Sequence, residues 1–442
     1  MMRALAVTFE QATTAHGAAR ALAVLAFVYL LAGYYVEPPF ELAPGIVLPA
    51  ATVVVALPAL LLAVLSRVTR YDVWFLGGAL VTFVVGAVLS PGSTYLGQKL
   101  LGIAQIMTSL TAGIVLVKVM DCLPRRTVSV LLAAGWGLIL VGAFLEVIGP
   151  LRPLVVAFGE LVYRTGGYHF YAADIRDLNL IGFPRPKLFT SEPSLVAIGF
   201  MMLANSWLVL QPSLGRAAAV TVATLVTLLL SGSPVLLVSL ALSAALAWAS
   251  TRRLRVGLCA AGLTVALAAL TAIAVPQLAG ALRERWERAV EESTTLEQTS
   301  ENLRLVFPAI TTVDVLAHSP VFGVGLSGKE VVASVSSLPF ADFVTDVQVG
   351  NNLALLLIYL GLAGTTAYLL LWRWYAKRLD IQHVGALALL VLALSQCMGG
   401  FESPRFWGYV FLAVGAFRTA ARRPASAPPL RPPAATISSV ST

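Results

Sequence analysis

The chain alternates between long apolar segments and short polar connections. Crossing a hydrocarbon core of about 30 Å takes ~20 apolar residues in a helix, and many of the segments approach that length. The pattern predicts membrane spans at residues 18–34, 44–66, 72–90, 100–120, 127–149, 192–211, 214–231, 234–250, 254–276, 350–372, 383–398 and 404–421. The sequence lacks the alternation of a membrane β-barrel. We therefore predict an all-α, polytopic integral membrane protein with about twelve transmembrane helices.

The connections between the spans differ in length. Two are long, at about residues 150–191 and 277–349, and we expect short helices in both. Residues 1–421 would then form a single transmembrane domain around these loops. Residues 422–442 are rich in Pro, Ala and Ser, which predicts a disordered tail.

Composition and charge support this class of protein. The chain is 58% hydrophobic and only 12% charged, whereas a soluble domain is about 25% charged. In a soluble protein the net charge of +8 would suggest a nucleic-acid partner, but here the charge follows the topology. The termini and alternate connections hold 18 of the 30 Lys and Arg residues, and only 4 of the 22 Asp and Glu residues. The positive-inside rule places both termini in the cytoplasm and both long loops outside, so no nucleic-acid partner is expected.

Basic side chains in the long loops run against this charge bias. Arg176, Arg185 and Lys187 lie in the first loop, and Arg304 lies in the second. Arginine pairs well with phosphates, and aromatic rings stack on sugars, so His169 among its tyrosines could contact a sugar. The set suits a pyrophosphate on a lipid carrier. Any one of these cations could instead contact lipid headgroups or an acid of its own loop.

The segment GFPRPKLFTSEPS, residues 182–194, brings a carboxylate to the start of the predicted span 192–211. Glu192 at a helix N-terminus could take the proton of an attacking hydroxyl, or it could orient an arginine or cap the helix. Ser191 as the N-cap, with Pro193 in the first turn, explains the segment as a helix start without any chemistry. The sequence leaves these interpretations open.

The second long loop contains an amphipathic stretch from Arg304 to His318, followed by SPVFGVG. Pro320, Gly323 and Gly325 predict a turn whose backbone amides can face outward. His318 could act on a substrate or simply end its helix.

Three further features bear on the chemistry. Glu402 and Arg405 have a spacing that suits either a structural salt bridge or the rim of a site. Cys122, Cys259 and Cys397 are far apart and match neither a metal-binding spacing nor an obvious disulfide pair, and the sequence predicts no cofactor. Ionisable residues in the middle of the spans, which a transporter would place around its cavity, are almost missing from the sequence.

The order of these motifs resembles that of the O-antigen polymerase and ligase family. HSPVFGVG at 318–325 is similar to a family phrase that precedes a loop. NNLALLLIYLGLAGTTAYLL, from residue 351, is similar to a helix that a His-Asn pair opens in the family. SEPS at 191–194 resembles the polysaccharide polymerase branch, and LLLSGSPVLLVSL at 228–240 resembles another helix start of the family. The resemblance covers residues 180–372.

The resemblance implies an integral membrane glycosyltransferase with a GT-C-like fold that needs no metal. Such enzymes use undecaprenyl-pyrophosphate-linked glycans at the outer face of the bacterial inner membrane. Polymerases join repeat units into an O-antigen or exopolysaccharide, whereas ligases transfer the finished chain to a lipid acceptor. The implied partners are the lipid-linked glycan, membrane lipids, a repeat-unit flippase and a chain-length regulator.

Two positions depart from the family pattern. Pro234 stands where the family has an arginine, and Asn351 stands where it has the histidine that is thought to act on the acceptor in ligases. The missing histidine argues against the ligase subclass and leaves the base unassigned. Ligase-type transfer and transport of lipid-linked glycans remain the alternatives. The expected site comprises the catalytic candidates Glu192, Arg304 and His318 and the substrate-binding candidates Arg176, Arg185, Lys187, His169, Gly323, Gly325, Asn351, Asn352 and Arg405.

Overall fold

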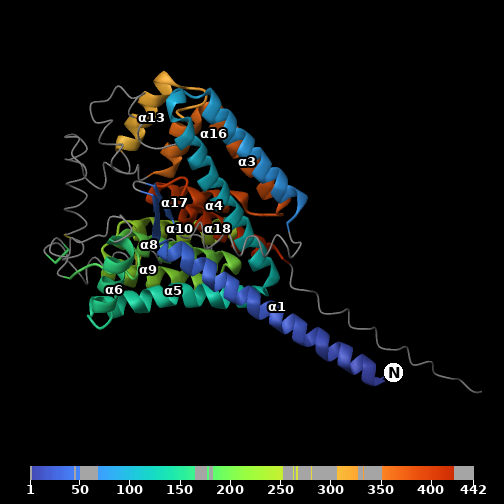
Figure 1. The fold of residues 1–442 in the computed structure, drawn as a ribbon. Helices are drawn as coiled ribbons and strands as arrows, with labels where there is room; N and C mark the ends of the chain where they lie inside the picture. Colours follow the sequence, from blue (N-terminus) through green and yellow to red (C-terminus); the bar gives the residue numbers. More distant parts are fainter. Residues whose placement is uncertain are drawn as a thin grey trace, which may run out of the picture.

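The structure is a computed structural model that describes residues 2–43, 46–49, 68–164, 183–251, 306–326 and 351–422, with isolated positions at 177–178, 262, 265–266, 280 and 332. Within these residues the regular secondary structure is helical apart from one short hairpin, and turns and loops connect the helices (Figure 1). Seven of the described helices are long and apolar enough to cross a membrane. Large apolar side chains, including Leu25, Trp74 and Leu138, are exposed on them, as lipid-facing surfaces require. The predicted fold class, a polytopic helical membrane protein, is confirmed.

The helices coincide with most of the predicted spans. The seven long apolar helices are α1 (Met2–Val36, apolar from Gly17), α3 (Arg70–Leu89), α4 (Leu96–Cys122), α5 (Arg125–Val147), α8 (Pro193–Leu210), α9 (Leu214–Ser231) and α16 (Asn352–Arg378). Three further helices lie at predicted spans: α10 (Val235–Thr251), α17 (Val384–Cys397) and α18 (Pro404–Ala421). The long loops contain the short helices α6 (Arg152–Gly159) and α13 (Phe307–His318) and the π-helical turn η2 (Glu160–Arg164), and a 3₁₀ turn, η1 (Ser93–Tyr95), precedes α4.

One predicted span begins differently. Strands β1 (Pro39–Ala43) and β2 (Ile46–Pro49) pair as an antiparallel hairpin, so the predicted span 44–66 opens with a strand. The rest of that span lies outside the described residues. Most of the predicted span 254–276 and the predicted tail beyond Arg422 also lie outside them.

Short polar signals start and stop the apolar helices. Thr69 and Asp72 form a capping box at the start of α3, and the Ser213 and Ser403 side chains cap α9 and α18. Gly232, with φ of 57°, ends α9 in the left-handed conformation. These caps satisfy backbone groups that would otherwise be left open at the helix ends.

Helix α8 lies at the centre of the helix bundle. Most of its residues are buried, and it packs against α1, α5, α9, α10, α17 and α18. Helix α4 packs along α18, and α3 contacts both α4 and α16. Helix α13 lies against α16, at the end of the molecule to which α3 and α4 extend (Figure 1).

Polar contacts join the helix ends at two opposite sides of the bundle. At one side, Arg418 and Arg422 of α18 pair with Asp121 of α4, and we call this side the Asp121 end. At the other side, the end of α5 at Glu146 meets the residues that lead into α8, and we call this side the Glu146 end. Helix α1 runs towards the Glu146 end, where its last residues meet the start of α18.

Candidate functional site

Glu146, at the C-terminal end of α5, holds the segment that leads into α8. Its carboxylate accepts the backbone amide of Lys187 at 3.0 Å and that of Leu188 at 2.8 Å. Arg152 pairs with the same carboxylate at 3.0 Å. Leu188 and Phe189 have positive φ angles of 40° and 64°, so the segment turns sharply at this point. A buried carboxylate with three donors fixes the course of this turn.

The two cations of the segment lie within the fold. Nε of Arg185 pairs with Asp177 at 2.8 Å, and the Arg185 carbonyl accepts a hydrogen bond from Arg152 at 3.1 Å. Lys187 is only 1% exposed. A diphosphate bound at this segment would therefore share Arg185 with Asp177.

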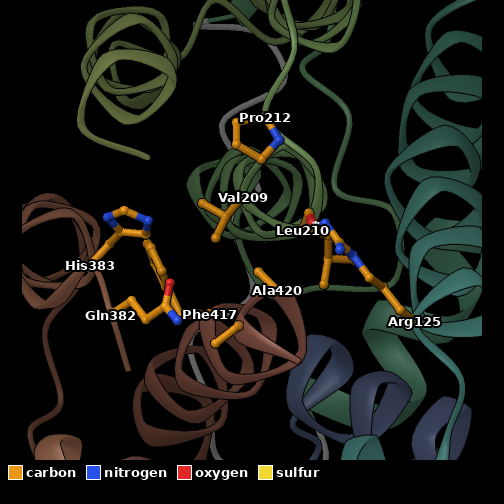
Figure 2. A pocket seen from close by; sticks show the side chains of 9 residues that line it. Arg125, Val209, Leu210, Pro212, Gln382, His383, Phe417 and Ala420 are labelled. Carbon is orange, nitrogen blue, oxygen red and sulfur yellow. Dashed lines mark hydrogen bonds between the residues drawn. The ribbon is translucent and has the colours of Figure 1, made fainter. Parts of the chain in front are cut away.

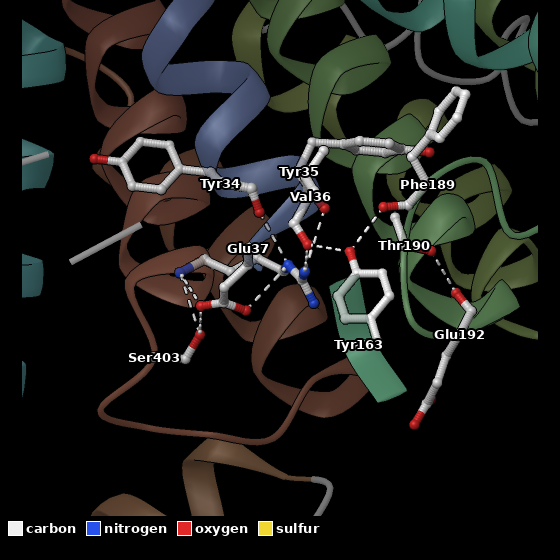
Figure 3. Close-up of polar contacts among 10 residues, drawn as sticks. Tyr34, Tyr35, Val36, Glu37, Tyr163, Phe189, Thr190, Glu192 and Ser403 are labelled. Carbon is white, nitrogen blue, oxygen red and sulfur yellow. Dashed lines mark hydrogen bonds and ion pairs between the residues drawn. The ribbon is translucent and has the colours of Figure 1, made fainter. Parts of the chain in front are cut away.

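Tyr163 ties the same segment to the end of α1. Its hydroxyl contacts the carbonyl of Val36 and lies 2.7 Å from the carbonyl of Phe189 (Figure 3). Thr190 closes the turn by donating its hydroxyl to the Lys187 carbonyl at 2.6 Å. The ends of α1 and α5 and the start of α8 thus share one polar layer at the Glu146 end.

Glu192 stands directly before α8. It occupies the N-cap position that the sequence assigned to Ser191, but its side chain caps no backbone amide. Its carboxylate instead accepts the Ser194 hydroxyl at 3.0 Å. The expected capping role of the Glu192 side chain is therefore wrong, whereas its role as a base or as the partner of an arginine stays a prediction.

Arg405 binds the end of α1. Its guanidinium donates to the last three carbonyls of α1 at 2.9, 3.2 and 2.9 Å. Glu37 pairs with it at 3.3 Å and accepts the Ser403 hydroxyl at 2.7 Å. The salt bridge suggested by the spacing of Glu402 and Arg405 is not formed, because Glu37 takes that place. An arginine that closes a helix C-terminus in this way serves the fold, and the expectation that Arg405 also binds substrate stays a prediction.

Helix α16 is broken at Gly361, which has φ of 61° and ψ of −167°. The two amides after the break donate to the carbonyls of Pro320 and Val321, at 2.8 and 3.0 Å. Two carbonyls in the turn before the break accept the amides of Val324 and Gly325, both at 2.9 Å. In an unbroken helix these four groups would bind one another. Residues 320–325 therefore complete the hydrogen bonding of α16 at its break.

Glycines allow the two backbones to approach this closely. A methyl group at Gly361 would stand 2.5 Å from the amide nitrogen of Gly323, which itself has φ of 61°. The amides of Gly323 and Gly325 bind backbone carbonyls, so they do not face outward as the sequence suggested. The two halves of α16 bend towards each other at the break. The Thr365 hydroxyl of the second half donates to the Leu356 carbonyl of the first half at 3.1 Å. A continuous helix would separate those residues by about 13 Å.

The start of α16 carries two asparagines in different environments. Asn351 is the N-cap: its side-chain oxygen accepts the amides of Leu353 and Ala354 at 3.0 and 3.1 Å, and its amide donates to Gln396 at 2.8 Å. Asn352 is 2% exposed, and both polar atoms of its side chain are buried without a hydrogen-bond partner among the described residues. Asn351 therefore caps α16, whereas the polar side-chain atoms of Asn352 have no hydrogen-bond partner among the described residues.

The loop between α17 and α18 fixes the backbone at Glu402. The Glu402 carbonyl accepts the Ser109 hydroxyl, midway along α4, at 2.9 Å. The indole of Trp407 donates to the adjacent Phe401 carbonyl at 2.7 Å. No salt bridge joins the Glu402 carboxylate to a cation in the described part of the chain, and burial raises its pKa to about 7.

The remaining predicted site residues are dispersed or undescribed. His318 is the last residue of α13, and its exposed ring binds the carbonyl of Asp314 at 2.9 Å. Arg304, Arg176 and His169 lie outside the described residues. The structure therefore joins Arg185, Lys187 and Glu192 in one segment and leaves their relation to Arg304 as a prediction.

Sequence reasoning missed the acids that organise these segments. Neither Glu146, near the end of the predicted span 127–149, nor Glu37 was singled out as a candidate site residue. The sequence signal that could have found them is an acid at the end of an apolar span in a chain whose loops carry arginines and lysines. Such an acid is expected to be buried against donors from a neighbouring segment.

A pocket of about 160 Å³ lies away from all of these residues, at the Asp121 end. Figure 2 shows Arg125, Pro212, His383 and Ala420 around it. The Arg125 guanidinium is bound to the carbonyl of Leu210. The pocket contains none of the predicted site residues.

Residues 217–369 match the family model described as O-antigen ligase. The matched region begins in α9, includes α10 and α13 and ends in α16 beyond its break. This match supports a relation to the O-antigen ligase and polymerase family, whose members act on lipid-linked glycans, and it does not separate polymerases from ligases. No curated protein shows a significant sequence match to the chain.

Proposed function

We propose that the protein is a metal-independent glycosyltransferase that polymerises undecaprenyl-pyrophosphate-linked repeat units at the outer face of the bacterial inner membrane. The match of residues 217–369 to the O-antigen ligase family carries this proposal. The matched region includes both the HSPVFGVG turn and the broken helix that this turn completes. Two of the motifs that suggested the family from sequence, HSPVFGVG and the helix that begins at residue 351, are therefore parts of one structural unit.

The proposed orientation follows from the charges at the two ends. The Asp121 end carries many basic side chains, among them Arg125, Arg216, Arg418 and Arg422. The positive-inside rule assigns that end to the cytoplasm and the Glu146 end to the outer face. Both termini are then cytoplasmic, and both long loops lie on the side where a flipped lipid-linked glycan is available.

The proposed chemistry is displacement of a diphosphate lipid by a sugar hydroxyl. Negative charge develops on the departing diphosphate, and cations held in place stabilise it. We assign this role to Arg185, Lys187 and Arg304. Glu146 supports the first two, because it holds the backbone of their segment through two amides. Arg176, His169 and His318 are proposed contacts to the glycan.

Asn351 favours polymerisation over transfer to a separate lipid acceptor. Its side chain caps α16 and binds Gln396, so the residue in the place of the ligase histidine is used by the fold. Ligase-type transfer is the second candidate, because the matching family model is described as O-antigen ligase.

The test uses purified protein in nanodiscs with an undecaprenyl-diphosphate-linked repeat unit as the only glycan. We expect a ladder of extended chains on gels. Arg304→Ala should reduce extension roughly a hundredfold, since a lost charge-assisted contact in the transition state costs about 3 kcal/mol. Arg304→Lys should rescue it partly, because an ammonium keeps the charge but loses the two-pronged geometry.

Arg373→Ala is the matched control, since Arg373 is exposed on α16 at the Asp121 end. It should leave the ladder unchanged. Transfer that occurs only when a lipid A core acceptor is added would identify a ligase. No transfer to either acceptor by the wild-type protein would refute the proposed function.

A further inference from the structure

Glu402 combines a fixed backbone with a carboxylate that no cation pairs with in the described residues. Other buried acids of this chain have charged partners: Glu37 with Arg405, Glu146 with Arg152, and Asp72 with Lys118. A partly buried carboxylate without such a partner lowers the stability of the fold. Packing alone therefore does not account for an acid at this position.

The start of α16 lies beside the loop that carries Glu402. Asn351 binds Gln396 near the end of α17, which anchors the first turn of α16 there. The ring of Tyr359 lies 6.4 Å from the ring of Phe401, the residue before Glu402. Asn352 and Tyr359 lie two turns apart on one face of α16. These contacts bring that face to the α17–α18 loop.

The chemistry of this corner suits a sugar. The Asn352 side chain offers two donors and an acceptor, all buried and without a partner in the described structure. Tyr359 adds an aromatic face, and the Glu402 carboxylate adds a strong acceptor. A ligand rich in hydroxyl groups would satisfy the amide that the protein leaves open.

We propose that Glu402 and Asn352 form the acceptor-sugar subsite, with Glu402 taking the proton of the attacking hydroxyl. This inference rests on the proposed glycosyl transfer. The hydroxyl oxygen forms a bond to the anomeric carbon, and the bond from that carbon to the diphosphate oxygen breaks with its electrons on the diphosphate. The hydroxyl proton moves to the Glu402 carboxylate, which later releases it to water. The Asn352 amide orients the hydroxyl.

The titration of Glu402 agrees with this role. Burial raises its pKa to about 7, a range in which a carboxylate is an effective base near neutral pH. Tyr359 is the titratable group that faces Glu402 from α16, and the uncharged Ser109 of α4 donates to the backbone carbonyl of Glu402. Arg405 on α18 is paired with Glu37. Among the described residues no charged side chain pairs with this carboxylate, so burial is the cause that raises its pKa.

Glu192, the base suggested by the sequence, differs in its surroundings. Its carboxylate accepts the Ser194 hydroxyl, and it stands at the start of α8, beside the segment of Arg185 and Lys187. The assignment of proton transfer to Glu402 leaves Glu192 the positioning role that the sequence also allowed.

The experiment compares E402Q and E402D with wild type in the nanodisc extension assay. We expect E402Q to lower kcat about a hundredfold or more, with KM for the lipid-linked donor within about twofold of wild type. The wild-type rate should rise with pH through about 7, because the deprotonated carboxylate is the active form, and the residual E402Q rate should lose this dependence. E160Q, in the first long loop, is the matched control and should keep the wild-type profile.

Two outcomes would overturn the assignment while the wild-type enzyme still extends chains. One is E402Q with wild-type kcat and pH dependence, and the other is an effect of E402Q on KM alone. E402D provides the second reading if E402Q does not fold. For E402D, which keeps a carboxylate but shortens its reach, a reduced kcat with a retained pH dependence supports the proposal, and an unchanged kcat refutes it. A wild-type protein that extends nothing speaks against the proposed function instead.

Discussion

Arg405 is a buried charged side chain whose hydrogen-bond donors bind other parts of the protein. It donates to three carbonyls at the end of α1 and pairs with Glu37, and it is only 5% exposed. Removing one partner of a buried ion pair leaves the other charge uncompensated, and this costs more than the pair itself contributes.

We predict that Arg405→Ala destabilises the protein by about 3–5 kcal/mol, because it leaves Glu37 without its paired cation and the helix-end carbonyls without the guanidinium donors. The double variant Glu37→Gln/Arg405→Ala should recover part of this loss. Thermal unfolding in detergent measures both effects, with Arg373→Ala as the exposed control. An Arg405→Ala protein with wild-type melting and no activity would instead show that this arginine binds substrate.

At this scale the spacing of residues along the sequence suggested a partner that the structure does not show. Glu402 and Arg405 looked like a pair because they are close in the chain, whereas the acid that Arg405 binds is 368 residues away. Lys187 was expected to reach a pyrophosphate or lipid headgroups, and the structure buries it. Spacing reports only local neighbours, so long-range pairing and burial had to come from the fold.

Helix α16 consists of two helical halves, and residues 320–325 bind the backbone groups left open at the break between them. Its amides and carbonyls at the break bind residues 320–325, and the approach of the two backbones leaves no room for a side chain at Gly361. The backbone angles there are also unfavourable for any residue with a Cβ atom.

We predict that Gly361→Ala lowers the free energy of unfolding by more than about 3 kcal/mol and abolishes activity, through strain at positive φ and a clash with Gly323. Gly137→Ala, inside α5 with open space around it, is the control. It should leave stability unchanged or raise it by up to about 1 kcal/mol. Expression level and melting temperature report the difference, and equal melting of the two variants would mean that the break is not required.

The elements themselves were largely predictable. Apolar runs place ten of the predicted spans on described helices, since a run of that length can satisfy its backbone in lipid only as a helix. The break in α16 was not predictable, because LGLAG also fits an unbroken helix with small residues for packing. The β1–β2 hairpin was missed for a similar reason, since its apolar residues continue directly into the predicted span.

The whole molecule has one end rich in arginine and one end where acids hold loop segments. The proposed orientation follows from that difference, and single cysteines can test it. Thr94, in the turn before α4, and Lys377, near the end of α16, are both exposed on opposite sides of the bundle.

We predict that, after Cys122, Cys259 and Cys397 are replaced by Ser, Thr94→Cys reacts with a membrane-impermeant maleimide in intact spheroplasts. Lys377→Cys should react only after the membrane is permeabilised, because the positive-inside rule places its end in the cytoplasm. Labelling followed by gel shift gives the reading. The reverse pattern would invert the topology and move the proposed site to the cytoplasm.

The paired break in α16 has a consequence for how the chain enters the membrane. Around Gly361, two amides and two carbonyls find partners only in residues 320–325, and each such group left open in lipid costs several kcal/mol. During synthesis the ribosome delivers residues 320–325 before α16. Residues 320–325 have then already left the translocation channel when α16, with its break at Gly361, enters it. With this order along the chain, α16 can insert laterally into the bilayer with the amides and carbonyls at its break already bound to residues 320–325.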